Sequence, residues 1–397
     1  MFIMGREEAE AVRRVIESKQ LFRYRGGEGG ETDQFEAEWA AKIGVKHAVA
    51  VTSGTAALMC GLVGLGIGPG DEVIVPAYTW MATAMAPLSV GAVPILAEVD
   101  ETLTLDAEDV ERRITPRTKA IIPVHMSGFP CDMDAIMAVA KKHNLVVLED
   151  ACQSPGGSYK GRRLGSMGAA GAFSFNHFKI IACGEGGATV TNDRKVNDRA
   201  LIYHDVGAAF REHAEEMTVP IFAGLNFRMN EILSAVLRVQ LGRLDGILEM
   251  LRREKAILRE ELSSVSGFSF NPSNDLAGDC GTILPLMFET PQDARRFIDG
   301  MKAEGIEVSS PIDSGRHVFV NWAPVVELRG AHHPALNPYA HPDCKADYSA
   351  GQCPKTLDYL ARTIFVFMAV DRSQEDLMNL IAAIKRVAEM PCASACK

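Results

Sequence analysis

Short apolar runs alternate with amphipathic segments through the first half of the chain. Runs of this length, rich in β-branched residues, are typical of buried strands. Seven of them lie at residues 47–51, 71–76, 92–99, 119–125, 145–150, 171–175 and 187–191. Helical patterns lie between several of them, such as residues 133–144, with apolar side chains at 133, 136, 137 and 140. The alternation predicts an α/β fold with a mostly parallel seven-stranded sheet, covered by helices on both faces.

A long amphipathic pattern follows in the second half of the chain. Apolar residues recur at 232, 233, 236, 237, 241, 244, 247, 248 and 251. This spacing predicts a helix over 231–255, with Asn230 as its N-cap and Glu231 in its first turn. Because the helix is so long, we expect it to bridge two domains.

The rest of the chain predicts a smaller α+β domain. Residues 282–289, 305–310 and 362–368 have strand patterns, and residues 373–390 have a helical one. We therefore place a large domain at residues 1–245 and a small domain at 246–397. The segment 311–356, rich in Pro, His and Asp, predicts a long loop.

Composition narrows the class of protein. The chain has 397 residues, of which 47% are hydrophobic and 23% charged, as in globular proteins of two or three packed units. No apolar run is long enough to span a bilayer, and Arg6, Glu7 and Glu8 occupy the place of a signal peptide's apolar core. We predict a cytoplasmic protein with no membrane partner. The net charge of −10 gives no general attraction to nucleic acid.

The cysteines and histidines predict neither a disulfide framework nor a metal site. Nine cysteines are scattered from Cys60 to Cys396, which fits a reducing compartment. A late group lacks the spacing of known zinc ligands; it consists of His332, His333, His341, Cys344 and Cys353.

Two of the predicted strands end in residues that suit a cofactor. Ser53, Gly54 and Thr55 follow a strand and open a helix, so their N–H and hydroxyl groups can cradle a phosphate. A purely structural turn is the alternative. Trp80 follows the next strand and supplies an aromatic ring, although packing in the core or at an interface would also explain it.

Two further strand ends carry ionisable groups. Asp150 ends an apolar strand, where a carboxylate needs a cationic partner such as a protonated ring nitrogen. The alternative is a helix N-cap. Lys179 follows another strand, and a lysine in a protein interior becomes a nucleophile that forms Schiff bases. The glycines at 184, 186 and 187 would let the backbone pass close to a cofactor. Cradle, aromatic ring, aspartate and lysine together indicate pyridoxal phosphate held covalently by Lys179.

At these residues the sequence resembles a known family. The runs "SGTAAL", "PAYTW", "EDACQ", "SFNHFK", "GEGG" and "GLNFRMNE" occur in this order over nearly the whole chain. They resemble the DegT/StrS group of sugar aminotransferases, which are fold-type I pyridoxal phosphate enzymes. The resemblance implies a homodimer with two shared sites, in which Asn226 reaches the phosphate in the neighbouring subunit.

The resemblance also implies a role for each matching residue. Lys179 would hold the cofactor, Asp150 would pair with the pyridinium nitrogen, and Gln153 would lie near the ring hydroxyl. Trp80 would stack on the ring. The phosphate would be bound by Gly54, Thr55 and Ser174, beside the hydroxyl of Ser53.

The implied activity is transfer of an amino group from glutamate or glutamine to a keto-sugar, in polysaccharide, lipopolysaccharide or secondary-metabolite biosynthesis. One alternative is a sugar dehydratase, because some relatives carry histidine in place of the lysine. Lys179 favours amino transfer, and His177 does not fill that position, so it either lines the substrate pocket or packs. The other alternative is a non-catalytic regulatory relative of the same fold.

Three stretches, 21–36, 124–128 and 316–328, resemble the branch that aminates 3-deoxy-octulosonate sugars at C8. A sugar-acid carboxylate would suit the bidentate fork of arginine, and the candidates are Arg23, Arg25 and Arg316. Surface arginines that serve only solubility are the alternative. A nucleotide-linked keto-sugar is the general expectation for the family.

Overall fold

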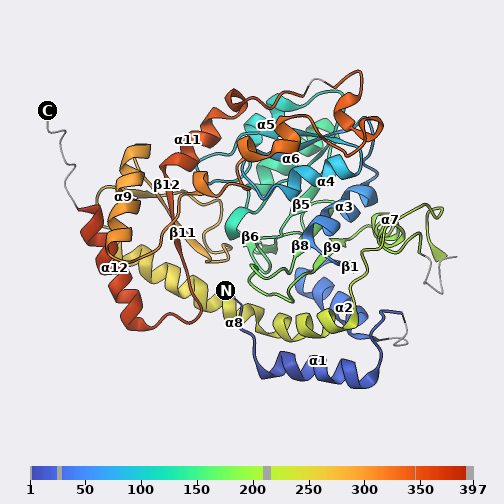
Figure 1. Cartoon of the computed structure of the whole chain (residues 1–397), viewed down its shortest axis with the longest axis horizontal. Coiled ribbons are helices and arrows are strands. Elements are labelled where there is room, and N and C mark those ends of the chain that lie inside the picture. The colour runs from blue at the N-terminus through green and yellow to red at the C-terminus, as the bar shows by residue number, and fades with distance from the viewer. Residues whose placement is uncertain (1, 25–28, 209–215, 345, 390–397) are drawn as a thin grey trace.

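Seven strands form a central sheet, as the sequence predicts. The computed structural model describes residues 2–24, 29–208, 216–344 and 346–389 (Figure 1). The strands of the large sheet are β1 (His47–Val51), β2 (Glu72–Pro76), β3 (Val93–Ala97), β4 (Thr118–Ile121), β5 (Val146–Asp150), β8 (Ala170–Ser174) and β9 (Gly187–Thr191). Their order is β1-β9-β8-β5-β4-β2-β3. The strands from β8 to β3 are parallel, and β9 is antiparallel to both of its neighbours.

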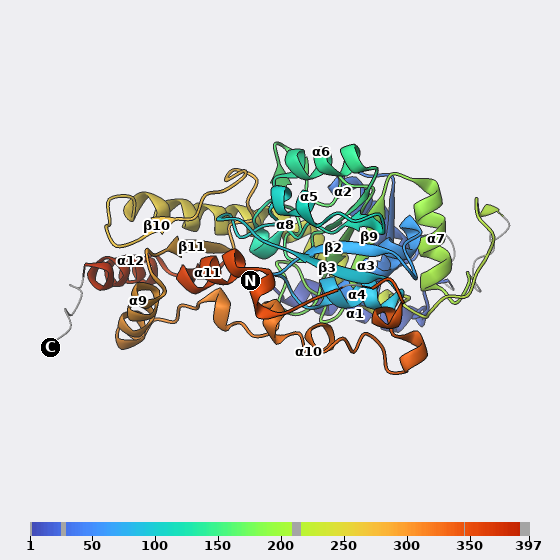
Figure 2. The same ribbon diagram turned by 90° about the horizontal axis from the view of Figure 1, so that it is seen from above.

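Helices cover both faces of this sheet (Figure 2). One face carries α3 (Gly54–Leu65), α4 (Ala82–Ser89) and α7 (Arg194–His204), whose apolar side chains form one core cluster with the sheet. The other face carries α2 (Glu31–Ile43), α5 (Ala107–Arg113) and α6 (Met133–His143). Trp39 of α2 packs edge-on against Phe173 of β8, with ring centroids 4.9 Å apart. The core is therefore divided into two layers by the sheet.

Helix α8 (Glu231–Glu261) runs along the length of the molecule (Figure 1). Asn230 caps it as predicted, because its side-chain oxygen accepts a hydrogen bond from the N–H of Leu233 at 3.1 Å. The helix packs against α1 (Arg6–Ser18), α2 and β11 (Ile283–Met287). It passes through residue 245 without a break, so the boundary placed there by the sequence lies inside a helix.

A second sheet has three antiparallel strands, β10 (Ser269–Phe270), β11 (Ile283–Met287) and β12 (Thr363–Phe367). It packs with α9 (Pro291–Ala303) and α12 (Gln374–Ala388), and α11 (Pro354–Arg362) leads into β12. The predicted strand at 305–310 is wrong, because only Ser309 forms a single bridge, with Phe365. Gly305 has a φ of +75° and Pro311 starts a 3-10 turn, so the chain turns on both sides of this segment, and it meets β12 at Ser309 alone.

The described residues 311–344 and 346–353 form most of the long loop predicted at 311–356, with short turns and α10 (Ala323–Val326), and the last three predicted loop residues belong to α11. This loop returns to the large sheet, where Trp322 and Tyr348 are buried in the same cluster as α3 and α4. The Tyr348 hydroxyl donates a hydrogen bond to the carbonyl of Pro94 in β3 at 2.5 Å. None of the described helices is both long enough and apolar enough to cross a membrane. A short hairpin of β6 (Ser158–Tyr159) and β7 (Arg162–Arg163) completes the strands.

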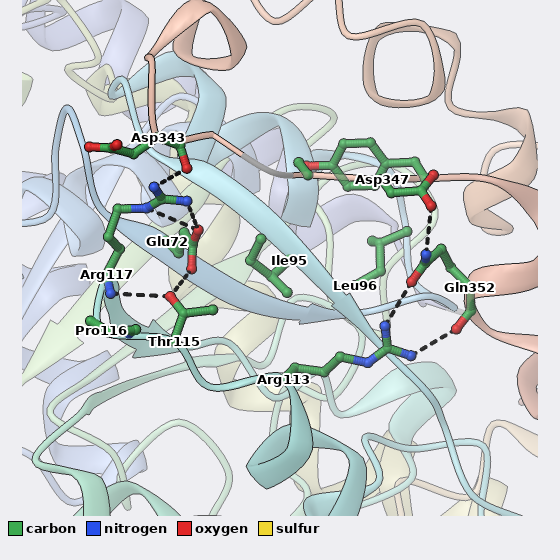
Figure 3. A pocket seen from close by; sticks show the side chains of 12 residues that line it. Glu72, Ile95, Leu96, Arg113, Thr115, Pro116, Arg117, Asp343, Asp347 and Gln352 are labelled. Atoms are coloured by element: carbon green, nitrogen blue, oxygen red, sulfur yellow. Dashed lines mark hydrogen bonds and ion pairs between the residues drawn. The ribbon is translucent and has the colours of Figure 1, made fainter.

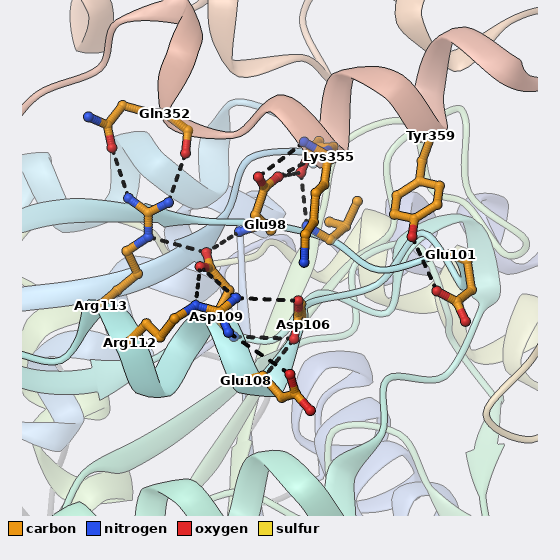
Figure 4. A network of polar contacts seen from close by, with 12 residues as sticks. Glu98, Glu101, Asp106, Glu108, Asp109, Arg112, Arg113, Gln352, Lys355 and Tyr359 are labelled. Carbon is orange, nitrogen blue, oxygen red and sulfur yellow. Dashed lines mark hydrogen bonds and ion pairs between the residues drawn. The ribbon is translucent and has the colours of Figure 1, made fainter. Parts of the chain in front are cut away.

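The edge strand β3 is fastened to α11 by a group of polar side chains (Figure 4). The Glu98 carboxylate accepts hydrogen bonds from the N–H groups of Lys355 (3.1 Å) and Thr356 (2.8 Å), and from the Thr356 hydroxyl (2.6 Å). The Glu98 N–H in turn donates to Asp109 at 2.8 Å. Both carboxylates are buried. We call Glu98, Asp109 and Thr356 the Glu98 clamp; it satisfies the first N–H groups of α11.

Candidate active site

A cavity of about 790 Å³ opens at the carboxyl ends of β1, β2, β5 and β8. The position is the one expected for ligands in a sheet of this type. The residues that line it include Ser53, Gly54, Thr55, Trp80, Asp150, Gln153, Ser174, Lys179 and Arg316. The structure thus brings together nine of the residues singled out from the sequence, which come from four strand ends and one distant loop.

One end of the cavity is built to receive an anion. The Ser53 hydroxyl oxygen caps α3 by accepting a hydrogen bond from the N–H of Ala56 at 3.1 Å. The next N–H groups, of Gly54 and Thr55, belong to the first turn, where a helix leaves donors free for an anion. A Cβ on Gly54 would lie 2.8 Å from Cβ of Ser174, so only glycine lets the helix approach β8 this closely. These groups fit a phosphate.

Two of the glycines after Lys179, Gly186 and Gly187, pack closely against the protein itself. A Cβ on Gly187 would lie 2.3 Å from the carbonyl oxygen of Ser53, so the glycine lets β9 pack against the Ser53 turn. A Cβ on Gly186 would lie 2.8 Å from Sγ of Cys183. The close approach is therefore to the protein's own backbone and side chains, and it holds the anion-binding turn in place.

Asp150 is buried at the end of β5, with 4% of its surface exposed. Its carboxylate accepts hydrogen bonds from the Thr83 hydroxyl at 2.8 Å and from the N–H of Cys152 at 3.1 Å. No helix follows Asp150 directly, since residues 151–157 form turns, which excludes the N-cap interpretation. Among the described residues no cation is paired with this carboxylate, so it can face the protonated ring nitrogen of a cofactor.

Lys179 lies in the loop that joins β8 to β9, a few residues past the strand end. Its N–H donates to the carbonyl of Asn176 at 3.0 Å, which shapes the turn. Burial lowers the pKa of the Lys179 amine, and Cys152 and Asp150 nearby only partly oppose that shift. A lowered pKa increases the fraction of neutral amine, which is the nucleophilic form.

Gln153 and Trp80 complete the part of the cavity that suits an aromatic ring. The side-chain oxygen of Gln153 accepts a hydrogen bond from the N–H of Ser127 at 3.1 Å. Trp80 is 40% exposed, and its ring centroid lies 5.2 Å from that of His317. A large aromatic ring half exposed at a cavity wall has a face available for a ligand.

The loop segment 313–317 lines the cavity beside Trp80, because the N–H of Met81 donates to the Arg316 carbonyl at 3.1 Å, and it brings Arg316 into the cavity. Within the described ranges, no carboxylate pairs with the Arg316 side chain. His317 lines the cavity as well, although no motif of the sequence pointed to it. Burial and the nearby charge of Lys179 lower the pKa of His317 to about 4, so its imidazole is neutral at physiological pH. The adjacent Arg316 is the only signal that could have pointed to it.

Two of the proposed substrate residues lie elsewhere. Arg23 is 1% exposed and donates hydrogen bonds at 2.6 Å to both carboxylate oxygens of Glu36. The expectation that it meets a substrate carboxylate is therefore wrong in this structure, because a guanidinium can be buried only when it is paired. His177 is exposed, does not line the cavity, and packs against the rings of Phe2 and Phe178. Arg25 lies outside the described residues.

Asn226 is exposed and does not line the cavity of its own chain. Its side-chain oxygen accepts a hydrogen bond from the N–H of Arg228 at 3.3 Å. The role expected for it, in a neighbouring subunit, stays a prediction. No group of three or more His, Cys, Asp or Glu side chains in the described parts of the chain could hold a metal ion.

A second cavity, of about 540 Å³, lies beside the edge strand β3 (Figure 3). Both of its arginines are bonded to neighbouring groups of the protein. Arg117 pairs with Glu72, and Arg113 donates to the Gln352 side chain and backbone, both at 2.8 Å. Both arginines of this cavity are satisfied within the described chain, and its lining includes no lysine, histidine or cysteine, so the chemistry belongs to the first cavity.

The fold and the first cavity define a class, the fold-type I enzymes that use pyridoxal phosphate. Comparison with known proteins gives the family: the DegT/DnrJ/EryC1/StrS aminotransferase family matches residues 3–312. The chain belongs to this family and is a pyridoxal phosphate-dependent aminotransferase, which confirms the enzyme class, cofactor and family expected from the sequence. The octulosonate branch stays a prediction.

Individual relatives agree with this assignment. The chain is 35% identical over 399 residues to the spore coat polysaccharide biosynthesis protein SpsC of Bacillus subtilis, covering 97% of this chain and 95% of the relative. It is 41% identical over 263 residues to dTDP-3-amino-3,4,6-trideoxy-alpha-D-glucose transaminase of Streptomyces venezuelae, covering 66% of each. Its structure matches that of S. venezuelae DesV in complex with a ketimine intermediate, with a TM-score of 0.80, 32% identity, and coverage of 97% and 95%.

Proposed function

We propose that the protein transfers an amino group from glutamate or glutamine to a keto-sugar. The observation that carries the proposal is the presence of Lys179, with its lowered pKa, in one cavity with Asp150 and the N-terminus of α3. Pyridoxal phosphate, when bound, supplies an electron sink that stabilises negative charge on the substrate carbon next to the nitrogen.

The residues of the cavity divide the binding of the cofactor among them. Its phosphate would be held by Ser53, Gly54, Thr55 and Ser174. Trp80 would cover the ring, and Gln153 would contact the ring hydroxyl. Asp150 would keep the ring nitrogen protonated, because a buried carboxylate without a protein cation favours a positive charge opposite it.

Lys179 would act twice. It would first bind the cofactor through its neutral amine, which burial favours. Once the amino donor has displaced it, its Nζ would be free to take up the proton of the substrate carbon and to release it again later in the reaction. One amine therefore serves as anchor and as acid–base group.

The keto-sugar is proposed from the relatives and from the cavity wall. The printed names of the relatives include a dTDP-sugar transaminase and GDP-perosamine synthase. Arg316 offers an exposed cation on the substrate side, suited to a phosphate or a carboxylate. Both a nucleotide-linked keto-sugar and a 3-deoxy-octulosonate sugar carry such a group.

We also propose that the active unit is a homodimer. Asn226 lies on the surface, outside its own cavity, where it could complete the cavity of a second copy. Large apolar side chains are exposed nearby in the chain and at the cavity, including Phe178 (77%), Ile221 (54%) and Leu225 (45%). Burial of such side chains is a common driving force for association.

The test is the absorption spectrum of the purified protein with pyridoxal phosphate, before and after addition of glutamate or glutamine. We expect a visible band from the cofactor bound to Lys179, which either donor bleaches and a keto-sugar restores. The Lys179→Ala variant should not form that band, whereas Lys160→Ala, at an exposed lysine, should behave as wild type. A wild-type band that neither donor bleaches would contradict the proposed donors.

The acceptor is tested by the second half of the same experiment. Enzyme bleached by the donor is mixed separately with a nucleotide-linked keto-sugar and with an octulosonate that carries a carbonyl at C8. Return of the band with one and not with the other identifies the substrate class. If neither restores the band, the keto-sugar proposal fails although the donor half-reaction stands.

A further inference from the structure

The short loop that contains Met126–Gly128 lies between the two domains and forms part of the wall of a side cavity next to the cofactor cavity. The N–H of Ser127 donates a hydrogen bond to the side-chain oxygen of Gln153 at 3.1 Å. The carbonyl of the same residue accepts a hydrogen bond from the hydroxyl of Thr282, at 2.5 Å. Thr282 lies directly before β11 in the small domain and is 4% exposed. One peptide segment thus joins the small domain to Gln153.

These residues share one wall. A side cavity of about 250 Å³ is lined by Ser127, Gln153 and Thr282, and it reaches Lys179 and His317, which also line the main cavity. The contact between the loop and the small domain therefore lies beside the reacting groups.

The loop holds a backbone conformation that needs support. Ser127 has φ 54° and ψ 22°, in the left-handed region that side chains rarely adopt. The next residue, Gly128, has φ +87°, and a Cβ there would lie 2.7 Å from Cβ of Cys280. The N–H of Cys280 donates to the Gly128 carbonyl at 3.1 Å. Two residues of the small domain, Cys280 and Thr282, thus hold the backbone at 127–128.

The start of the loop is anchored in the large domain. His125 and Glu149 are fully buried and lie 3.0 Å apart, from Nε2 to Oε2. The N–H of Cys131 donates to Nδ1 of His125 at 3.1 Å. Glu149 also accepts hydrogen bonds from the N–H groups of Gly165, Met167 and Gly168. Both ends of the loop are therefore fixed in the large domain. The middle of the loop, at Ser127, is held from the small domain by the hydrogen bond from Thr282 to its carbonyl.

This arrangement determines how the Gln153 amide can act. Its oxygen is occupied by the Ser127 N–H, so its NH₂ group is the part left to donate. We propose that Thr282 is a positioning residue: through the Ser127 backbone it orients the Gln153 amide so that Nε2 donates to the ring hydroxyl oxygen of the cofactor. The inference rests on the proposed function, which places Gln153 at that oxygen. A donor there withdraws electron density from the oxygen, which weakens its hold on the proton shared with the cofactor–lysine linkage.

The experiment compares two threonine-to-valine substitutions, each of which replaces a buried hydroxyl with a methyl group of similar size. Thr282→Val removes the hydroxyl that holds Ser127. Thr363→Val removes a hydroxyl at a fully buried threonine of the same small sheet, where it donates to the Tyr359 carbonyl at 2.7 Å. The readouts are the dissociation constant of pyridoxal phosphate and the pH at which the absorption band of the bound cofactor titrates.

We expect Thr282→Val to weaken cofactor binding about three- to tenfold, the effect of one hydrogen bond, and to raise the pH midpoint. Thr363→Val should change neither, and Thr282→Ser, which keeps a hydroxyl, should restore both. The ionisable groups that line the two cavities are Tyr78, Asp150, Cys152, Lys179, Glu185, Asp313, Arg316 and His317. All of them are present in every variant, so the change in midpoint reports the Gln153 contact.

A double-mutant cycle shows whether Gln153 transmits the effect. In a Gln153→Ala background, Thr282→Val should have no further effect on the midpoint. Equal behaviour of Thr282→Val and Thr363→Val, or full additivity with Gln153→Ala, would overturn the inference. If wild type formed no band with pyridoxal phosphate, the proposed function itself would fail, and that result differs from either of these.

Discussion

The two cavities beside the large sheet differ in how their charges are satisfied. Beside β3, Arg117 pairs with Glu72, and Arg113 bonds to Asp109 and Gln352 (Figures 3 and 4). In the catalytic cavity, the side chains of Lys179 and Arg316 have no such partner among the described residues. A protein keeps unpaired polar groups in a cavity when a ligand completes them, and the loss of stability is part of the function. The paired groups beside β3, in contrast, hold neighbouring parts of the fold together.

The largest expected difference between the two regions is in kcat. It is measured by making the same substitution at two equally buried aspartates, Asp150 and Asp109. Asp150→Asn should lower kcat about 10²- to 10³-fold, because the ring nitrogen loses its buried counter-charge. Asp109→Asn, in the Glu98 clamp, should leave kcat within about twofold, because it is remote from the cavity. Steady-state kinetics of the two variants check this. Equal losses of kcat would mean that the two regions are not functionally separate.

The second effect concerns stability. Glu98→Ala leaves the N–H groups of Lys355 and Thr356 without their acceptor and should lower the free energy of unfolding by about 1–3 kcal/mol. Glu98→Gln keeps one oxygen and should lose less. Urea unfolding measures both variants. A variant with unchanged stability but reduced kcat would show that the clamp acts on catalysis instead.

A pair of arginines extends the comparison to binding. Arg316→Ala should raise the KM for the anionic substrate about tenfold at nearly constant kcat, because one charge-assisted hydrogen bond is lost. Arg117→Ala removes a paired arginine and should leave KM unchanged. The ratio of the two KM values is the measurement. If KM rose with Arg117→Ala and not with Arg316→Ala, the substrate would bind in the second cavity, beside β3, and the proposal would be contradicted.

The smallest effect is a dependence of stability on pH. His317 has a folded pKa of about 4, against about 6.5 when unfolded, so below pH 6.5 the unfolded state binds the proton first. The free energy of unfolding should therefore fall as the pH drops from 6.5 towards 4, by less than about 1.4 kcal/mol per pH unit. His317→Gln should reduce this slope. Unfolding curves at pH 6.5 and 5.5 test it, and identical slopes would contradict the assignment.

The sequence predicted the parts of the fold that leave local patterns. All seven strands of the large sheet and the capped helix α8 were found from runs of apolar residues, and the strand ends led directly to Asp150 and Lys179. These signals are strong because strands buried on both faces must be apolar throughout.

Other features depend on contacts between distant segments and left no local signal. The ion pair of Arg23 with Glu36 could not be distinguished from a substrate-binding arginine in the sequence. The hydroxyl of Thr83 on Asp150, and that of Thr282 on the Ser127 backbone, join residues 67 and 155 positions apart. Such pairs are defined only when the chain has folded.

Helix α8 also determines how the molecule responds to cleavage and to thermal unfolding. At 1.5 Å per residue its 31 residues extend about 46 Å, and they supply apolar surface to the cores beneath both sheets. Cleavage of the chain at residue 245 would expose the side chains of Leu244, Ile247 and Leu248, which are buried in the intact protein. Neither half can then be isolated as a stable fragment by cleavage there, and heat should melt the two sheets in a single cooperative transition.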